Sequence, residues 1–373
     1  MSLFGKSESY LGVDIGAGGI KVVELRKTKG RPQLWTYGIL DTKLDIHVPT
    51  FPGPSHTAVP GDEEKQKPTP VLVDPRVPAY AELLRYVIDQ ARVTTKHATA
   101  SLPVSQVFHA VVTLPLVPEK DLDREVRAKV AKMLPRSLEE MQVVHQRIPS
   151  RKNEAPKDIK LLVTAAPKLL VQFYTDVFAA AGLILDELET EAFAIERALV
   201  GRDTATVMVV DIGAERTNFF IVDNGLPVTH RSISIGGQAF DAALHNALGV
   251  DEKCISEIKY DISRTASADI PFDLFIPMID PIAKEIQYGI DLFTHQTGNE
   301  GRRPEKIILA GGAALFPPVL AILRRAFPVQ SVVAFVGDPW ARVVYQQGLK
   351  SVLDTIGSRM AIAIGLALRH LSP

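Results

Sequence analysis

Short apolar runs recur along the chain and predict buried β-strands. Eight of these runs are rich in Val, Ile, Leu and Phe and are bounded by turn residues. Several are apolar at consecutive positions, which indicates strands that are covered on both faces. The predicted strands are 11–14, 20–25, 99–102, 110–113, 160–165, 207–211, 218–222 and 306–310.

Segments between the strands carry apolar residues at three- to four-residue spacing, which predicts amphipathic helices. One helix is expected over 78–92 and a second directly after Pro118, where acidic residues come first and lysines last, as the helix dipole favours. A third is expected over 167–181, ending at Gly182 as a C′ glycine. Alternating helices and strands favour α/β layers over a β-sandwich.

Residues 44–78 interrupt this pattern. Eight of the chain's 26 prolines lie between Pro49 and Pro78, together with a run of charges at 62–65. Such a composition predicts a surface insertion or mobile loop. A solvated spacer and a partner-binding arm are both compatible with it.

Composition narrows the class of protein. At 373 residues and 46% hydrophobic, the chain is long enough for two domains. The formal charge is −1, so no net field attracts nucleic acid or an anionic membrane. Cys254 is the only cysteine, which excludes an internal disulfide and thiolate-rich metal sites and fits a reducing cytoplasm.

The sequence carries no recognisable targeting signal or metal-binding motif. The first ten residues lack the apolar region of a secretory signal. The long uncharged stretch 307–323 is interrupted by paired glycines and paired prolines, so we expect a buried strand, a turn and a helix there and not a membrane span. The nine histidines show no metal-ligand spacing.

The pentapeptide Val-Asp-Ile-Gly-Ala occurs at 13–17 and again, unchanged, at 210–214. Each copy follows one apolar strand and leads into another, which predicts two duplicated halves. Glycines in such a turn allow backbone N–H groups to approach phosphate closely. An aspartate just before the turn would repel phosphate unless a cation intervened, so Asp14 and Asp211 are expected to hold hydrated Mg²⁺.

The glycines involved are Gly16, Gly18 and Gly19 in the first copy and Gly213 in the second. A single Asp-x-Gly turn would most simply be an ordinary hairpin, but two identical copies favour binding. A further strand at 306–310 ends in Gly311 and Gly312 before an expected helix, where a nucleotide could meet helix N–H groups. Walker, dinucleotide-binding and Gly-x-Ser-x-Gly motifs are absent from the sequence.

These residues resemble the actin, hexokinase and chaperone ATPase superfamily, and within it the PilM family of type IV pilus assembly proteins. The resemblance runs nearly end to end and includes 3–6, 11–16, 20–25, 191–198, 232–237 and 361–369. It implies an α/β fold of two duplicated actin-like, ribonuclease H-like domains with an extra small α+β subdomain. The chain ends at residue 373 without the amphipathic tail typical of the related cell-division protein FtsA.

The resemblance also implies roles for individual residues in binding ATP and Mg²⁺. Glu191 matches the position of a water-orienting catalytic residue, and Asp14 and Asp211 match the magnesium position. Gly311, Gly312 and Ala313 correspond to an adenosine motif. The remaining cofactor-binding candidates are Gly16, Ala17, Gly18, Gly19, Lys21, Gly213, Ala214, Thr217, Asn218, Gly236, Gly237, Glu257 and Lys259.

Domain boundaries follow from the same resemblance. Residues 1–96 are expected to form a first actin-like subdomain and 97–162 the extra subdomain, which would bind a partner. Residues 163–206 would complete the first domain and include the connecting helix, and 207–373 would form the second domain with its adenosine-binding segment.

The implied function is a cytoplasmic ATP-binding scaffold of type IV pilus or type II secretion assembly, peripheral to the inner membrane. Its partner would be the cytosolic N-terminal tail of a PilN-type protein, with self-association possible and no nucleic acid bound. ATP hydrolysis is expected to be slow or absent. The alternatives are an FtsA-like homologue that polymerises with ATP, a small-molecule kinase, and a nucleotide-free pseudo-ATPase.

Overall fold

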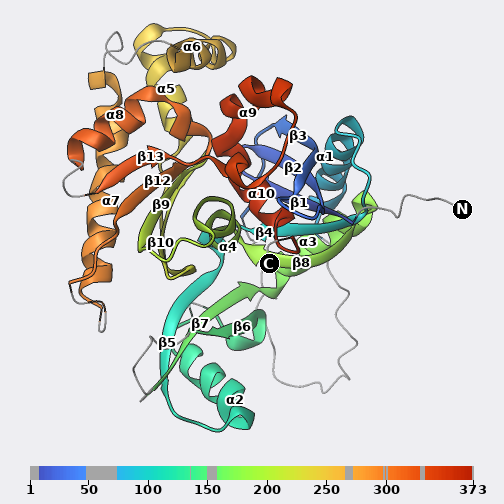
Figure 1. Cartoon of the computed structure of the whole chain (residues 1–373), viewed down its shortest axis with the longest axis vertical. Coiled ribbons are helices and arrows are strands. Elements are labelled where there is room, and N and C mark those ends of the chain that lie inside the picture. The colour runs from blue at the N-terminus through green and yellow to red at the C-terminus, as the bar shows by residue number, and fades with distance from the viewer. Residues whose placement is uncertain are drawn as a thin grey trace, which may run out of the picture.

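The computed structural model describes residues 8–47, 74–134, 136–148, 158–264, 272–296, 299, 301–327 and 332–371. Two five-stranded sheets and one three-stranded sheet organise this part of the chain (Figure 1). Most of the proline-rich insertion expected over 44–78 lies outside the described residues.

The two large sheets have the same topology, which confirms the predicted duplication. In each, the first strand pairs antiparallel with the next strand, which pairs antiparallel with a third. On the other side of the first strand lie two successive parallel strands. The first sheet, in spatial order, contains β3 (Gln33–Asp41), β2 (Gly19–Arg26), β1 (Ser9–Gly16), β4 (His97–Leu102) and β8 (Ile184–Thr190). The second contains β11 (Leu226–Ile233), β10 (Thr217–Asp223), β9 (Val207–Ile212), β12 (Lys306–Ala310) and β13 (Val333–Val336).

Helices cover the outer face of each sheet (Figure 1). Against the first sheet pack α1 (Val77–Gln90) and α3 (Lys168–Ala181), whose buried residues share one core with β1 and β2. Both are amphipathic as predicted, and α3 ends at Gly182 with φ of 81°. The helices described for the second domain are α5 (Gly237–Leu248), α6 (Glu252–Arg264), α7 (Ile276–Thr294) and α8 (Pro317–Ala326). In α9 (Lys350–Ile356), Leu353 shares a core with Val23 and Leu25 of β2 in the first sheet.

Two further helices lie between the sheets: α4 (Glu191–Ile195), which continues as a π-helix over Glu196–Val200, and α10 (Ala361–Ala367). Close backbone contact holds α10 in place. A Cβ on Gly12 of β1 would lie 2.0 Å from the Ala363 carbonyl oxygen, and one on Gly365 would lie 1.8 Å from that of Ala194. Only glycine permits this approach, so α10 joins β1 directly to α4.

The small third sheet has the order β5 (Phe108–Pro115), β7 (Asp158–Pro167), β6 (Met141–Arg147) and packs against α2 (Glu119–Val130). It projects from the rest of the molecule in Figure 1. The predicted boundaries 97–162 need correction, because β4 pairs in parallel with β1 in the first sheet and β7 continues to Pro167. Parallel pairing joins residues that are distant in sequence, and so the run at 99–102 could not be assigned to a sheet from sequence.

Residues 307–323 form β12, a short 3₁₀ turn and the start of α8, as predicted. Across the described residues, no helix combines the length and the apolar character that crossing a bilayer requires.

Candidate nucleotide site

The two Val-Asp-Ile-Gly-Ala segments end β1 and β9 and turn into β2 and β10. Asp14 lies opposite Lys21 in the first hairpin, and Asp211 lies opposite Asn218 in the second, seven residues on in both cases. A Cβ on Gly18 would lie 3.0 Å from the Cβ of Ala214. The two loops therefore contact each other between the domains.

Three carboxyl groups are buried near these loops: Asp14, Asp211 and Glu191. The Lys21 ammonium lies 3.5 Å from Asp14, and the Ser101 hydroxyl donates a hydrogen bond to Asp14 at 3.2 Å. Lys21 also lies 3.6 Å from where a Cβ on Gly16 would stand. One lysine thus faces three acidic groups.

The shared burial changes their acidity. Burial, and then the charges of Asp14 and Asp211, raise the pKa of Glu191 to about 8. Burial and the charge of Asp14 raise the pKa of Asp211 to about 6, although Lys21 and a hydrogen bond from Asn218 act in the opposite direction. A cation near these groups would relieve their repulsion.

Within the described ranges, no three His, Cys, Asp or Glu side chains are arranged to hold a metal ion together. Aspartates can hold Mg²⁺ through its bound waters without all of them contacting the ion. Those waters then need hydrogen-bond acceptors around them.

Unpartnered buried oxygens supply such acceptors. Asn218 Oδ1, Ser232 Oγ, Thr190 Oγ1 and Ser358 Oγ have no hydrogen-bond partner in the structure. Asn218 is the cross-strand neighbour of both Asp211 and Ser232, so these three residues form a row across β9, β10 and β11. Unpaired buried polar atoms are costly, and a polar ligand would satisfy them.

The glycine-rich segments pack onto the second loop. The Gly237 amide donates to the Gly213 carbonyl at 2.8 Å, and a Cβ on Gly236 would lie 2.6 Å from the Ala214 oxygen. Thr217 is fully buried and donates its hydroxyl to the Ile235 carbonyl at 2.7 Å. Thr217 therefore positions the segment that leads to Gly236.

Gly311 packs against the side chain of Asp211. Its φ is 86°, its amide donates to the Ser358 carbonyl at 3.0 Å, and a Cβ there would stand 2.6 Å from Asp211 Oδ1. Gly312 is exposed beside Arg359, whereas Ala313 is buried in the core of the second domain. The end of β12 thus adjoins the carboxylate cluster.

Other predicted residues have different surroundings. Ala17 is buried in the first turn, and Gly19 has φ of 126° with its Cα against the Leu40 carbonyl. On α6, Glu257 is exposed and Lys259 forms an ion pair with Asp241 of α5 at 2.6 Å. Lys259 is therefore engaged within the second domain.

Sequence reasoning missed several residues of the site: Ser101, Val104, Thr190, Ser232 and Ser358. Ser101 meets Asp14 because β4 pairs with β1, and the Val104 amide donates to Glu191 Oε2 at 3.0 Å. No local motif marks these positions. Strand pairing and packing between distant segments bring them to the site.

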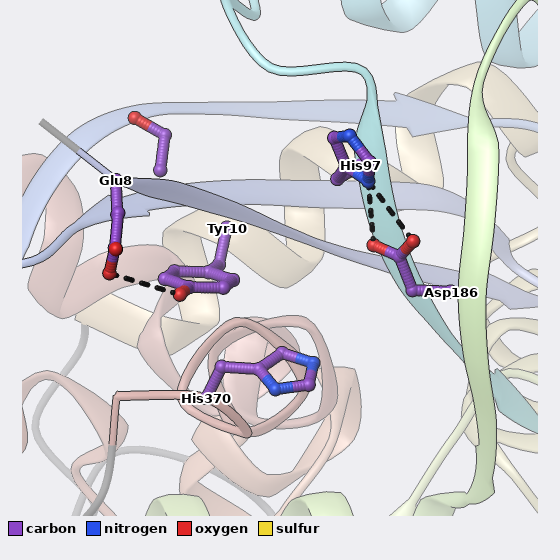
Figure 2. A pocket seen from close by; sticks show the side chains of 6 residues that line it. Glu8, Tyr10, His97, Asp186 and His370 are labelled. Carbon is purple, nitrogen blue, oxygen red and sulfur yellow. Dashed lines mark hydrogen bonds and ion pairs between the residues drawn. The ribbon is translucent and has the colours of Figure 1, made fainter. Parts of the chain in front are cut away.

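A cavity of about 300 Å³ lies elsewhere, at the amino ends of β1, β4 and β8 (Figure 2). Its walls include Tyr10 stacked on His370, with 5.2 Å between ring centroids, and His97 3.0 Å from Asp186. Asp14 and Ser101 stand at the opposite ends of β1 and β4. The cavity is thus separate from the carboxylate cluster.

Comparison with known proteins agrees with this architecture. A chain of the structure titled "PilM-PilN type IV pilus biogenesis complex" superposes with a TM-score of 0.75 at 22% identity, covering 98% of this chain and 99% of that one. Ethanolamine utilization protein EutJ from Carboxydothermus hydrogenoformans gives 0.52 at 14% identity, covering 97% and 90%. The MamK double helical filament gives 0.50 at 12% identity, covering 97% and 98%.

These likenesses establish an actin-like fold of two α/β domains and confirm the predicted fold class. The profile of the family described as "Type IV pilus assembly protein PilM" matches residues 74–371, which span most of the chain. This chain therefore belongs to the PilM family of type IV pilus assembly proteins.

Proposed function

We propose that this protein binds Mg²⁺ and ATP between its two actin-like domains and acts as a scaffold in type IV pilus assembly. The observation that carries the nucleotide proposal is the pair of touching loops beside three buried carboxyl groups that share one lysine. Bound Mg²⁺ would supply the positive charge that the site lacks.

Different residues of the chain would bind the phosphates, the Mg²⁺ and the adenosine. Backbone N–H groups around Gly16–Gly19 and Gly213–Ala214 would bind phosphate oxygens, together with Lys21. Asp14 and Asp211 would hold Mg²⁺ through water, with Asn218 orienting that water. The adenosine would lie toward Gly236, Gly237 and Gly311–Ala313, with Glu257 and Lys259 at its outer side.

Hydrolysis by this site would be slow. Glu191 stands where a water-orienting group is expected, but its carboxyl group is buried. One of its oxygens already accepts the Val104 amide. Nucleotide would then act chiefly by favouring a closed arrangement of the domains.

The partner we propose is the cytosolic N-terminal tail of a PilN-type inner-membrane protein. The support is that a protein with this fold is a component of the PilM-PilN type IV pilus biogenesis complex. Such a tail would keep the protein in the cytoplasm at the inner membrane. A short extended peptide fits a sheet edge flanked by apolar side chains.

The small sheet offers such an edge at β5. Val111 and Leu116 are 37% and 62% exposed there. The neighbouring Leu114 is buried among α2 and β7 in the core of the small sheet, and Val117 packs partly against that core. Lys129 donates to the Thr113 carbonyl at 2.6 Å, so a peptide would pair with the other half of the strand.

Calorimetry tests the nucleotide proposal. Wild type should bind Mg·ATP, and Asp14→Ala and Asp211→Ala should each weaken binding at least tenfold while circular dichroism stays native. Asp203→Ala, which removes a half-exposed aspartate paired with Lys306, is the matched control and should bind like wild type. Failure of folded wild type to bind at millimolar ATP would refute the proposal.

Membrane recruitment tests the partner proposal. In cells with the pilus machinery, Val111→Lys with Leu116→Lys should release the protein into the soluble fraction, because two charges would replace apolar contacts. Val144→Lys is the control, since Val144 is 56% exposed on β6 at the other edge of the same sheet. Equal release by the control would place the docking surface elsewhere.

A further inference from the structure

Residues 103–109 connect the first domain to the small sheet. Here β4 ends at Leu102, a 3₁₀ turn covers Val104–Gln106, and β5 starts at Phe108. The turn is closed by hydrogen bonds from the Gln106 and Val107 amides to the carbonyls of Pro103 and Val104. This connection is therefore ordered and short.

Its two valines are buried in different cores. Val107 packs into the core of the first domain with α1 and α3. Val104 packs with residues of α4 and of β9 and β10, which belong to the second domain. Movement of one domain relative to the other must therefore strain or shift this segment.

At its beginning, the segment is held by the candidate nucleotide site. The Val104 amide donates to Glu191 Oε2 at 3.0 Å, and both residues are buried. The charges of Asp14 and Asp211 act on the same Glu191 carboxyl group. A ligand bound at these carboxyl groups would therefore act directly on the residue that holds the segment at Val104.

At its end, the segment is held by the second domain. His109 Nε2 lies 2.7 Å from the Pro227 carbonyl of β11, so it carries the proton and donates. His109 Nδ1 then accepts from the Thr164 hydroxyl at 3.2 Å on β7 of the small sheet. The same ring packs edge-on against Phe193 of α4 and His230 of β11.

We propose that residues 103–109 form a coupling strap through which ligand binding between the domains sets the orientation of the small sheet and its affinity for a partner peptide. The strap touches the acidic cluster through Glu191, the second domain through Pro227, and the small sheet through Thr164. The proposal rests on the proposed function, because it requires both a nucleotide and a peptide. Thermodynamic linkage then makes the effect reciprocal.

The test uses the full chain and a fluorescent peptide of the N-terminal cytosolic segment of the PilN-type protein from the same organism. Its Kd is measured by anisotropy with and without a saturating, non-hydrolysable Mg·ATP analogue. Wild type should show a change of about tenfold, within the range common for coupled sites. The analogue's Kd should change by the same factor when the peptide is saturating.

His109→Phe keeps an aromatic ring of similar size but removes the bonds to Pro227 and Thr164. It should bind each ligand alone within about threefold of wild type and reduce the coupling factor to nearly one. His145→Phe, at a partly buried histidine of β6 in the same sheet, is the control and should keep the wild-type factor. If His109→Phe kept the full wild-type coupling factor, the proposed role of the strap would be wrong.

A second measurement avoids reliance on variants. Hydrogen exchange of wild type should show altered protection over 104–115 when the analogue binds, and no change there would overturn the proposal. If both ligands bind but neither affects the other, the strap is wrong and the proposed function stands. If folded wild type binds no nucleotide, both are overturned.

Discussion

The two phosphate-loop candidates have the same five residues and the same hairpin register, yet their aspartates have different surroundings. Asp14 has a lysine across the hairpin and a serine hydroxyl on the neighbouring strand. Asp211 has a neutral asparagine across its hairpin and Ala310 on the neighbouring strand, and its pKa is raised. The residue seven positions later, together with the pairing strand, therefore decides the electrostatics of each loop.

This asymmetry has a consequence for ligand binding. The first loop brings its own cation and is the natural contact for phosphate. The second loop retains uncompensated negative charge and an unpartnered Asn218 oxygen, which suit a hydrated cation. Duplication thus produced two similar turns with complementary roles in the proposed site.

Replacing the lysine should have the largest effect. Lys21→Asn gives the first hairpin the residue of the second and leaves buried Asp14 without its cation. The free energy of unfolding should fall by about 4 kcal/mol, as when a buried ion pair loses one partner. Urea denaturation without nucleotide measures it, and Lys27→Asn, at an exposed ion pair with Glu8, should change little.

Glu191→Gln should stabilise the nucleotide-free protein. The raised pKa means that folded protein holds this proton up to about pH 8 whereas unfolded protein releases it near 4.5. The contribution of Glu191 to the free energy of unfolding is therefore full below pH 4.5 and is lost as pH rises to about 8. Glutamine does not titrate, so the variant should gain about 3 kcal/mol at pH 7 and nothing near pH 4.

Thermal unfolding from pH 4 to 8.5 measures this difference, with the exposed Glu139→Gln as the control. Burial also lowers the pKa of His109 and His230, so both proteins should lose stability in acid, but that loss cancels in the difference. A difference that is constant across pH would mean that Glu191 is not a buried, proton-holding group. Rapid ATP turnover by wild type that Glu191→Gln abolishes would show that the residue is catalytic.

Asp211→Asn should behave similarly, with a smaller pKa shift behind it. The raised pKa of Asp211, about 6, predicts that the contribution of this group to wild-type stability falls between pH 4 and 6 and stays low above pH 6. The variant should be about 3 kcal/mol more stable than wild type at pH 7 and should bind Mg·ATP at least tenfold more weakly. A variant that loses both stability and binding would contradict the view that this carboxylate is kept for its ligand.

Interior strands and amphipathic helices were predictable from sequence, but several edge strands were not. The apolar runs at 11–14, 207–211 and 306–310 lie in β1, β9 and β12, which have neighbours on both sides. The missed strands β3, β8, β11, β13 and β6 all lie at sheet edges. An edge strand is less buried and needs no continuous apolar run, so its pattern is weak.

The same limit applies to the candidate site. The repeat located Asp14 and Asp211, because a duplicated pentapeptide is a local signal. Ser101, Ser232 and the Val104 amide join the site through pairing or packing over long sequence distances, which no local pattern encodes.

Gly18→Ala should have the smallest effect and tests whether the two loops must touch. No backbone strain is expected, because Gly18 is not among the glycines with positive φ in the described residues. The added Cβ would stand 3.0 Å from that of Ala214, so the loops must separate by a few tenths of an ångström. The free energy of unfolding should change by less than about 1 kcal/mol, and Mg·ATP affinity by about threefold.

Gly30→Ala, whose Cβ would meet nothing within 4 Å, is the control and should leave the affinity unchanged. If ATP binding opens the space between the loops, the Gly18→Ala penalty should vanish or become a gain when nucleotide is bound, which calorimetry resolves. A loss greater than about a hundredfold would instead mean that the loops must stay in contact around the ligand.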